Sequence, residues 1–147
     1  MVNLITDRTQ AHVDLRNRLA KKGWAKMTAS EREIWLSGDA TKGAYNYTDL
    51  NRVESAVAEL SEYMGLGLIT KTDWNNWDIP MTSDMNRYYG NVKTIINAFP
   101  DVGFPELPYN MQNLTYETAN NIEIALQLAY EHLTNAVRCG EIYCGEV

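Results

Sequence analysis

The 147-residue sequence has few of the residues that build disulfide or metal scaffolds. It contains two cysteines, Cys139 and Cys144, and two histidines, His12 and His132, which lie far apart along the chain. A structural zinc site uses four ligands, usually in close pairs, so this set predicts no metal site. Because a reducing cytosol disfavours disulfides, we expect Cys139 and Cys144 to stay free thiols, with a bridge across a small terminal hairpin as the alternative.

Long apolar runs and a secretion signal are also absent from the sequence. No run approaches the roughly 18 apolar residues of a membrane span. The opening segment, MVNLITDRTQ, has neither the basic nor the apolar region of a signal peptide. We therefore expect a protein that folds in the cytoplasm and has no membrane partner.

Catalytic motifs are missing as well. The glycines of MGLGLIT lack the lysine of a phosphate-binding loop, and neither a GxSxG turn nor an HExxH motif occurs. Acidic pairs such as Glu31 with Glu33 and Glu59 with Glu62 exist, but catalytic carboxyls must face each other across a cleft, roughly 5 to 9 Å apart. The sequence therefore predicts no enzyme, no catalytic residue and no cofactor.

The composition is that of a globular protein. Hydrophobic residues make up 45% and charged residues 22% of the chain, close to globular averages. A chain of this length buries most of its apolar surface without metals or disulfides, so we expect a single helical domain over residues 1–147.

The net charge of −6 argues against nucleic acid as a partner, but the charge is unevenly distributed. Residues 1–32 carry a net charge of +4, and residues 33–147 carry −10. We expect the basic face to be matched by neighbours in the same fold or in an oligomer; a basic interaction arm is the alternative.

Helix caps and apolar spacing predict an all-α fold, a bundle of four to five helices. The first helix lies within residues 6–23, with Asp7 or Thr9 as its cap and a glycine as its stop. The second begins with Thr28 and Glu31, which have the spacing of a capping box, and also ends at a glycine.

The third helix follows the tyrosine-rich turn in KGAYNYTDLNRVESAVAEL, residues 42–60. Thr48 is expected to cap it, with Tyr47 before the cap as a hydrophobic staple. Gly43 and Asn46 permit unusual backbone angles, and the tyrosines seal the helix entry, so we interpret the segment as a packing turn. The apolar stripe consists of Leu50, Val53, Val57, Leu60 and Met64.

Thr82 or Ser83 is expected to cap the fourth helix, and Pro100 to end it. The fifth begins at Thr115 or Thr118. Their apolar faces are Met85, Tyr88, Tyr89, Val92, Ile95, Ile96 and Phe99, and Ala119, Ile122, Leu126, Ala129, Leu133 and Val137. The terminal segment EIYCGEV is compatible with a short strand or hairpin.

The last helix should lie at the centre of the bundle, because Ile124 and Leu128 fall outside its main stripe. We place Leu126 in the core, so that Leu126→Ala costs roughly 2–5 kcal/mol. We place Glu123 on an outer face, so that Glu123→Ala changes stability by about 0.5 kcal/mol or less.

Aromatic residues are the candidate ligand-binding groups. Trp74 and Trp77 lie in the polar loop KTDWNNWDIP, and Tyr45 and Tyr47 precede the third helix. Exposed tryptophans flanked by Asp and Asn can stack on sugar rings while polar groups hold hydroxyls. The alternative, which we favour, is that these rings close the ends of the bundle.

A series of motifs resembles a helical module of phage and prophage structural proteins from Gram-positive bacteria, often tail-associated. It runs from RTQAHVDLRNRLAKKGWAKMTASEREIWLSG through KGAYNYTDLNRVESAVAEL, KTDWNNWDIPMTSDMNRYYGNVKTI and LPYNMQNLTYETANNIEIAL to CGEIYCGEV. The match spans nearly the whole chain, and KGAYNYTDLNRVE is its most specific part. The resemblance implies a virion setting, with the protein folding in the host bacterial cytoplasm, and it implies no activity and no set of binding residues.

These observations lead to the hypothesis of a non-enzymatic virion module, associated with the tail or baseplate, that binds another protein or a copy of itself. The alternative is a glycan-binding module for the bacterial cell surface, with Trp74, Trp77 and the nearby tyrosines as its contacts. A small cell-wall hydrolase is a third, weaker interpretation.

Overall fold

The computed structural model describes the backbone of residues 1–145 and the side chains of residues 1–136. Over these residues the protein is helical and no strand occurs, which confirms the predicted all-α fold class. The α-helices are α1 (Gln10–Lys22), α2 (Ala29–Ser37), α3 (Tyr47–Met64), α4 (Thr82–Asn97) and α5 (Tyr116–Gly145). Short 3-10 helices are η1 (Trp24–Lys26), η2 (Asp39–Gly43) and η3 (Met111–Asn113).

The C-terminal segment is helical rather than extended. Helix α5 continues to Gly145, so the short strand or hairpin considered for EIYCGEV does not form over residues 141–145. A growing helix gains one hydrogen bond for each residue it fixes, whereas a strand here would need a partner strand. The thiols of Cys139 and Cys144 lie outside the described side chains, and their free state stays a prediction.

Local capping explains where the first two helices begin. Thr9 caps α1, and its backbone N–H donates to Nδ1 of His12 at 3.0 Å, so Asp7 is not the cap. The predicted capping box of α2 is confirmed, since the Glu31 N–H donates to Thr28 Oγ1 at 3.2 Å and the Thr28 N–H donates to the Glu31 carboxylate at 2.9 Å.

The prediction that Thr48 caps α3 was wrong, because Asn46 is the cap. The Asn46 side-chain oxygen accepts from the Thr48 N–H at 2.9 Å, and the Asp49 carboxylate accepts from the Asn46 N–H at 2.9 Å. Asparagine caps helices better than threonine does, and here it is supported by a carboxylate three residues later. Tyr47 is thus the first residue of the helix and not a staple before it.

Helices α4 and α5 begin close to the predicted positions. Helix α4 starts at Thr82, but the prediction that Thr82 or Ser83 caps it was wrong, because Met81 is the cap residue and its N–H donates to the Asp84 carboxylate at 2.8 Å. Both threonines proposed for α5 take part, since the Thr118 N–H donates to Thr115 Oγ1 at 3.2 Å and the Thr115 N–H donates to Thr118 Oγ1 at 2.9 Å.

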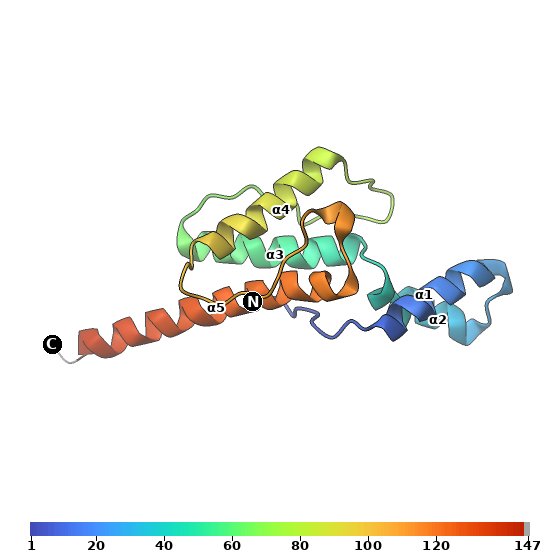
Figure 1. The fold of residues 1–147 in the computed structure, drawn as a ribbon, viewed down its shortest axis with the longest axis horizontal. Helices are drawn as coiled ribbons and strands as arrows, with labels where there is room; N and C mark the ends of the chain where they lie inside the picture. The colour runs from blue at the N-terminus through green and yellow to red at the C-terminus, as the bar shows by residue number, and fades with distance from the viewer. Residues whose placement is uncertain (146–147) are drawn as a thin grey trace.

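Helices α3, α4 and α5 run in the same direction and form a three-helix bundle (Figure 1). Each connection, residues 65–81 and residues 98–115, therefore returns along the length of the bundle. Long connections permit such parallel neighbours, whereas short ones would impose antiparallel packing. The contacts that fix this direction are Tyr45 with Tyr88 near the helix starts, and Tyr63 with Tyr130 and Phe99 with His132 near the ends of α3 and α4.

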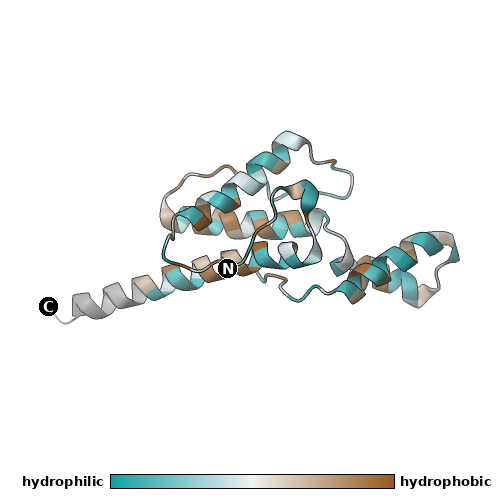
Figure 2. Cartoon of the chain, in the orientation of Figure 1, coloured by the Kyte–Doolittle hydropathy of each residue, from teal (hydrophilic) through white to brown (hydrophobic). Residues whose placement is uncertain are grey.

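Two hydrophobic clusters hold the structure together. The main cluster lies among α3, α4 and α5, where hydrophobic residues recur between polar ones (Figure 2). A second, smaller cluster of Leu19, Met27 and Ala40, with Leu15, Ile34 and Trp35 against it, lies in the N-terminal unit of α1, η1, α2 and η2. We call this unit, residues 10–43, the helical hairpin; it projects from one end of the bundle (Figure 1).

The predicted core position of Leu126 is confirmed, because its side chain is fully buried in the main cluster. We expect Leu126→Ala to lower the free energy of unfolding by about 2–5 kcal/mol, since the deleted methyl groups leave a cavity. Urea denaturation followed by circular dichroism measures this. The matched control is Gln127→Ala at the next, exposed position, and an equal loss in both variants would contradict the assignment.

The predicted outer position of Glu123 was wrong, because its side chain is 0% exposed. Helix α5 packs against α3 and α4 and is also covered by the N-terminal segment, whose Ile5 N–H donates to the Glu123 carboxylate at 2.6 Å. The buried sector of α5 is therefore wider than its apolar stripe.

Candidate functional site

The segment from Gly43 to Thr48 joins the helical hairpin to the bundle, and the clefts of the protein gather around it. Tyr45 lines three clefts, of about 490, 430 and 280 Å³. Tyr47 lines the smallest of these and a further cleft of about 600 Å³. The tyrosine-rich turn that stands out in the sequence is therefore the centre of the candidate site.

Tyr45 is a packing residue at this junction. Its hydroxyl makes a short hydrogen bond with the hydroxyl of Tyr88, and the guanidinium carbon of Arg8 lies 5.6 Å from its ring centre. Burial raises the pKa of both tyrosines above the ordinary value. Both phenols are therefore neutral at physiological pH and join the starts of α3 and α4.

Gly43 is required at this junction by a close approach and not by an unusual backbone angle. A Cβ atom at this position would lie 2.1 Å from the carbonyl oxygen of His12 and 2.7 Å from the Cβ of Arg16. Neither Gly43 nor Asn46 has a positive φ, so the expectation of unusual backbone angles was wrong. The glycine allows α1 to lie directly against η2.

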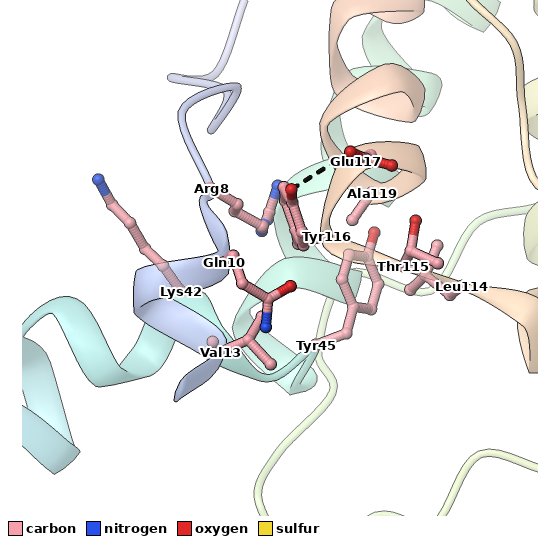
Figure 3. A pocket seen from close by; sticks show the side chains of 11 residues that line it. Arg8, Gln10, Val13, Lys42, Tyr45, Leu114, Thr115, Tyr116, Glu117 and Ala119 are labelled. Carbon is pink, nitrogen blue, oxygen red and sulfur yellow. Dashed lines mark hydrogen bonds between the residues drawn. The ribbon is translucent and has the colours of Figure 1, made fainter. Parts of the chain in front are cut away.

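The cleft shown in Figure 3 opens between α1, η2 and the start of α5. Its two cations are already neutralised: Arg8 pairs with carboxylates behind the cleft wall, and Lys42 pairs with Asp7 at 2.7 Å. The Tyr116 hydroxyl donates to Glu117 at 3.2 Å. Little unsatisfied charge is left there for a ligand.

The buried charges beside this cleft form a closed network. Arg8 contacts Asp49 at 2.8 Å and Glu123 at 2.7 Å, and Arg52 contacts Glu123 at 2.8 Å and also pairs with Asp49. Burial opposes the charge on Arg8, but the two carboxylates outweigh it and hold the pKa of Arg8 above its ordinary value. Two positive and two negative groups balance, so the network is structural: it fastens the N-terminal segment to α3 and α5.

A second buried carboxylate, Glu54, holds the connection between α3 and α4. It accepts from the Lys71 N–H at 2.6 Å, from Trp74 Nε1 at 3.1 Å, and from both terminal nitrogens of Arg87 at 2.5 and 2.8 Å. Asn51 adds two hydrogen bonds to the Trp74 backbone, at 2.7 and 2.8 Å. Residues 71–74 are therefore fixed against α3.

The four aromatic residues predicted for ligand binding, Trp74, Trp77, Tyr45 and Tyr47, do not all lie in one site. Trp74 is 5% exposed, with its indole N–H bonded to Glu54, and lines the smallest cleft together with Tyr45 and Tyr47. Trp77 lies outside that cleft and is 85% exposed. The structure thus brings three of the four together and leaves Trp77 on the surface.

The largest of these four clefts, of about 600 Å³, contains polar groups that the sequence interpretation did not single out. Trp35, at the end of α2, forms one wall, and the Arg16 guanidinium lies over its ring at 3.4 Å. Asn76 and Asp78 approach from the opposite side, on the connection between α3 and α4. These residues come from the helical hairpin and from the bundle, which are distant in sequence. No local sequence motif could therefore have predicted the cleft.

The acidic pairs considered for catalysis do not face each other across a cleft. Glu31 caps α2 and binds Lys22 at 2.7 Å, and the hydrogen bond from Lys22 lowers its pKa. Glu59 pairs with the N-terminal amine at 3.0 Å, while Glu33 and Glu62 are exposed. Among the described residues, no group of three or more His, Cys, Asp and Glu side chains could hold a metal ion.

Four large apolar side chains on the two connections of the bundle are strongly exposed. Trp77, Ile79, Met81 and Tyr109 are 85%, 88%, 65% and 89% exposed. Met81 lines a cleft with Asn110, the neighbour of Tyr109, so the two connections meet there. We call these four residues the loop surface.

The chain matches no protein-family model, no curated protein and no solved structure. No helix in the described part of the chain has the length and apolar character to cross a membrane.

Proposed function

We propose that the chain is a non-enzymatic protein-interaction module of a phage or prophage particle, associated with the tail or baseplate. The motif series that resembles tail-associated helical modules supports the setting. The loop surface supports the binding role and is the observation that carries the proposal.

The chemistry of the loop surface favours a protein as the partner. Tryptophan, tyrosine and methionine are enriched at protein interfaces and supply most of the binding energy when a partner buries them. The neighbouring Ile79 offers no group that could bond to a sugar hydroxyl. A cluster of this kind is typical of surfaces that another protein covers.

The loop surface is also held in place before binding. Glu54 and Asn51 fix Trp74 against α3, three residues before Trp77. The Trp77 N–H donates to the Asn75 side chain at 2.9 Å, and the Asp78 carboxylate accepts from the Asn75 N–H at 3.0 Å. A preformed turn loses less conformational entropy on binding, which favours affinity.

The test measures binding to purified tail and baseplate proteins of the same particle by isothermal titration calorimetry. We expect Trp77→Ser and Ile79→Ser to weaken binding at least about tenfold, as removal of central interface anchors does. The matched control is Ile69→Ser, another strongly exposed isoleucine of the same connection outside the loop surface, which should leave binding unchanged. Failure of the wild-type protein to bind any tail or baseplate protein would overturn the proposal.

The largest cleft supports a second candidate function, the recognition of cell-surface glycans. It combines aromatic rings, Trp35 and Tyr47, with the amide and carboxylate groups of Asn76 and Asp78, a combination suited to sugar rings and hydroxyls. Titration of purified cell-wall polysaccharide, followed by tryptophan fluorescence, separates this candidate from the first. A saturable change that Tyr47→Ala abolishes would support glycan binding, and an unresponsive wild-type protein would remove it.

A further inference from the structure

The charge of the protein is separated between its two ends. Residues 15–30 contain five Lys and Arg and no Asp or Glu, whereas exposed carboxylates lie at the opposite end of the bundle. Residues 15–30 form the far end of the helical hairpin, the part most distant from the bundle (Figure 1). We call residues 15–30 the basic tip.

The cations of the basic tip are not neutralised by the bundle. Within the described side chains, Lys22 pairs with Glu31 of the helical hairpin itself. Arg18, Lys21 and Lys26 are exposed and have no carboxylate partner there. The sequence analysis expected the basic face to be matched within the fold or within an oligomer, with a basic interaction arm as the alternative. These contacts provide no match within the fold for Arg18, Lys21 and Lys26.

The opposite end of the bundle is acidic. Glu62 at the end of α3, Asp101 after α4 and Glu131 on α5 are all exposed. They lie at one end because Tyr63 packs against Tyr130 with ring centres 6.4 Å apart, and α4 reaches α5 through a similar pair of rings. We call Glu62, Asp101 and Glu131 the acidic end.

The parallel arrangement of the helices adds to this polarity. Parallel helices align their dipoles, and the negative poles of α3 and α4 both point toward the acidic end. Neither helix has a basic residue in its last turn to offset that pole. Helix α1, in contrast, ends in Lys21 and Lys22 at the basic tip.

We propose that the protein associates head to tail, with the basic tip of one copy docked on the acidic end of a second copy. The partner is a second copy because the chain itself carries the complementary surface, at a place its own tip does not reach (Figure 1). A contact between two different patches of the same chain is heterologous, so it generates a ring or an open filament rather than a two-fold dimer. This deepens the proposed function, on which it rests, by naming a copy of the chain as one of the partners.

The test is sedimentation velocity across a dilution series at low and high salt. We expect wild-type assemblies larger than a dimer at about 0.02 M salt that dissociate at about 0.5 M, because salt screens exposed charge pairs. Arg18→Glu/Lys21→Glu should reduce association at least about tenfold at low salt. The matched control, Lys93→Glu/Lys71→Glu, makes the same change in net charge away from the basic tip and should associate like the wild type.

Charge exchange makes the test specific for the two ends. Glu62→Lys/Glu131→Lys, which reverses the acidic end, should be monomeric alone, as should the variant with the reversed basic tip. A mixture of these two variants should associate again, because each end then meets an opposite charge on the other variant. A monomeric wild-type protein at low salt, or a mixture that stays monomeric, would overturn the proposal.

Two further outcomes separate this inference from its alternatives. Trp77→Ser should keep self-association, so loss of the loop-surface function and loss of head-to-tail assembly are distinguishable. Binding of a labelled DNA duplex that the reversed basic tip abolishes would assign the tip to nucleic acid and also overturn the proposal.

Discussion

Glu123→Ala is expected to lower the free energy of unfolding by about 3–5 kcal/mol, because it breaks a buried network of charges and leaves Asp49 as the one carboxylate for two cations. The Glu123 carboxylate accepts from Arg8 at 2.7 Å and from Arg52 at 2.8 Å through one oxygen, and from Ile5 and Arg52 through the other. Arg8 is itself buried, so its charge has no route to water once Glu123 is removed.

Urea denaturation followed by circular dichroism measures this loss. The matched control is Glu131→Ala, an exposed glutamate on the same helix, which should change stability by about 0.5 kcal/mol or less. Glu123→Gln keeps the shape of the side chain but removes its charge, so its stability should lie between those of the wild type and Glu123→Ala. Similar values for Glu123→Ala and Glu131→Ala would mean that the network contributes nothing to folding.

The network also shows why the sequence placed Glu123 on the wrong side of α5. The Arg8–Glu123 contact joins residues 115 positions apart. The spacing of apolar residues along one helix gives no information about such a distant partner. A capping box is different, because it involves only residues within four positions of each other. The capping box of Thr28 and Glu31 was predicted from the sequence and is confirmed. This local hydrogen-bond pair was predictable from the sequence, whereas the long-range ion pairs were not.

The same distinction applies to the fold. The apolar face of α4 was predicted residue by residue, because burial and helical period coincide there. The parallel direction of the bundle could not be predicted, since it depends on the course of the connections. Residues 71–74 lie along α3 because Glu54 and Asn51 of that helix bind their backbone. In the sequence, Glu54 and Asn51 look like ordinary polar residues of an amphipathic helix.

The candidate site was partly readable. Tyr45 reaches into the bundle, where its hydroxyl bonds to Tyr88, whereas Tyr47 is the first residue of α3 and is exposed. The sequence predicted the role of this turn in packing, but it did not distinguish the two rings. Trp74 and Trp77 are three residues apart in similar polar surroundings. Trp74 is buried because Asn51 and Glu54 of α3 bind it, whereas Trp77 is exposed.

Gly43→Ala is expected to destabilise the helical hairpin by at least about 3 kcal/mol, at the upper end of the range for overpacking. The added methyl group would overlap the His12 carbonyl oxygen, at 2.1 Å, and the Cβ of Arg16, at 2.7 Å. Both atoms are held by α1, so relief requires α1 to move away from η2. The control is Gly90→Ala in the interior of α4, where nothing lies within 4 Å; alanine should there add about 0.5–1 kcal/mol of stability.

Hydrogen exchange followed by mass spectrometry locates the damage. The helical hairpin and the bundle have separate hydrophobic clusters, so Gly43→Ala should accelerate exchange in residues 10–43 while the amides of α3 keep their protection. Equal loss of protection in both units would show that they unfold together, with the junction at Gly43 supporting the bundle as well as the helical hairpin. Unchanged exchange in residues 10–43 would contradict the close approach itself, because no L-residue larger than glycine fits at the observed separation of α1 and η2.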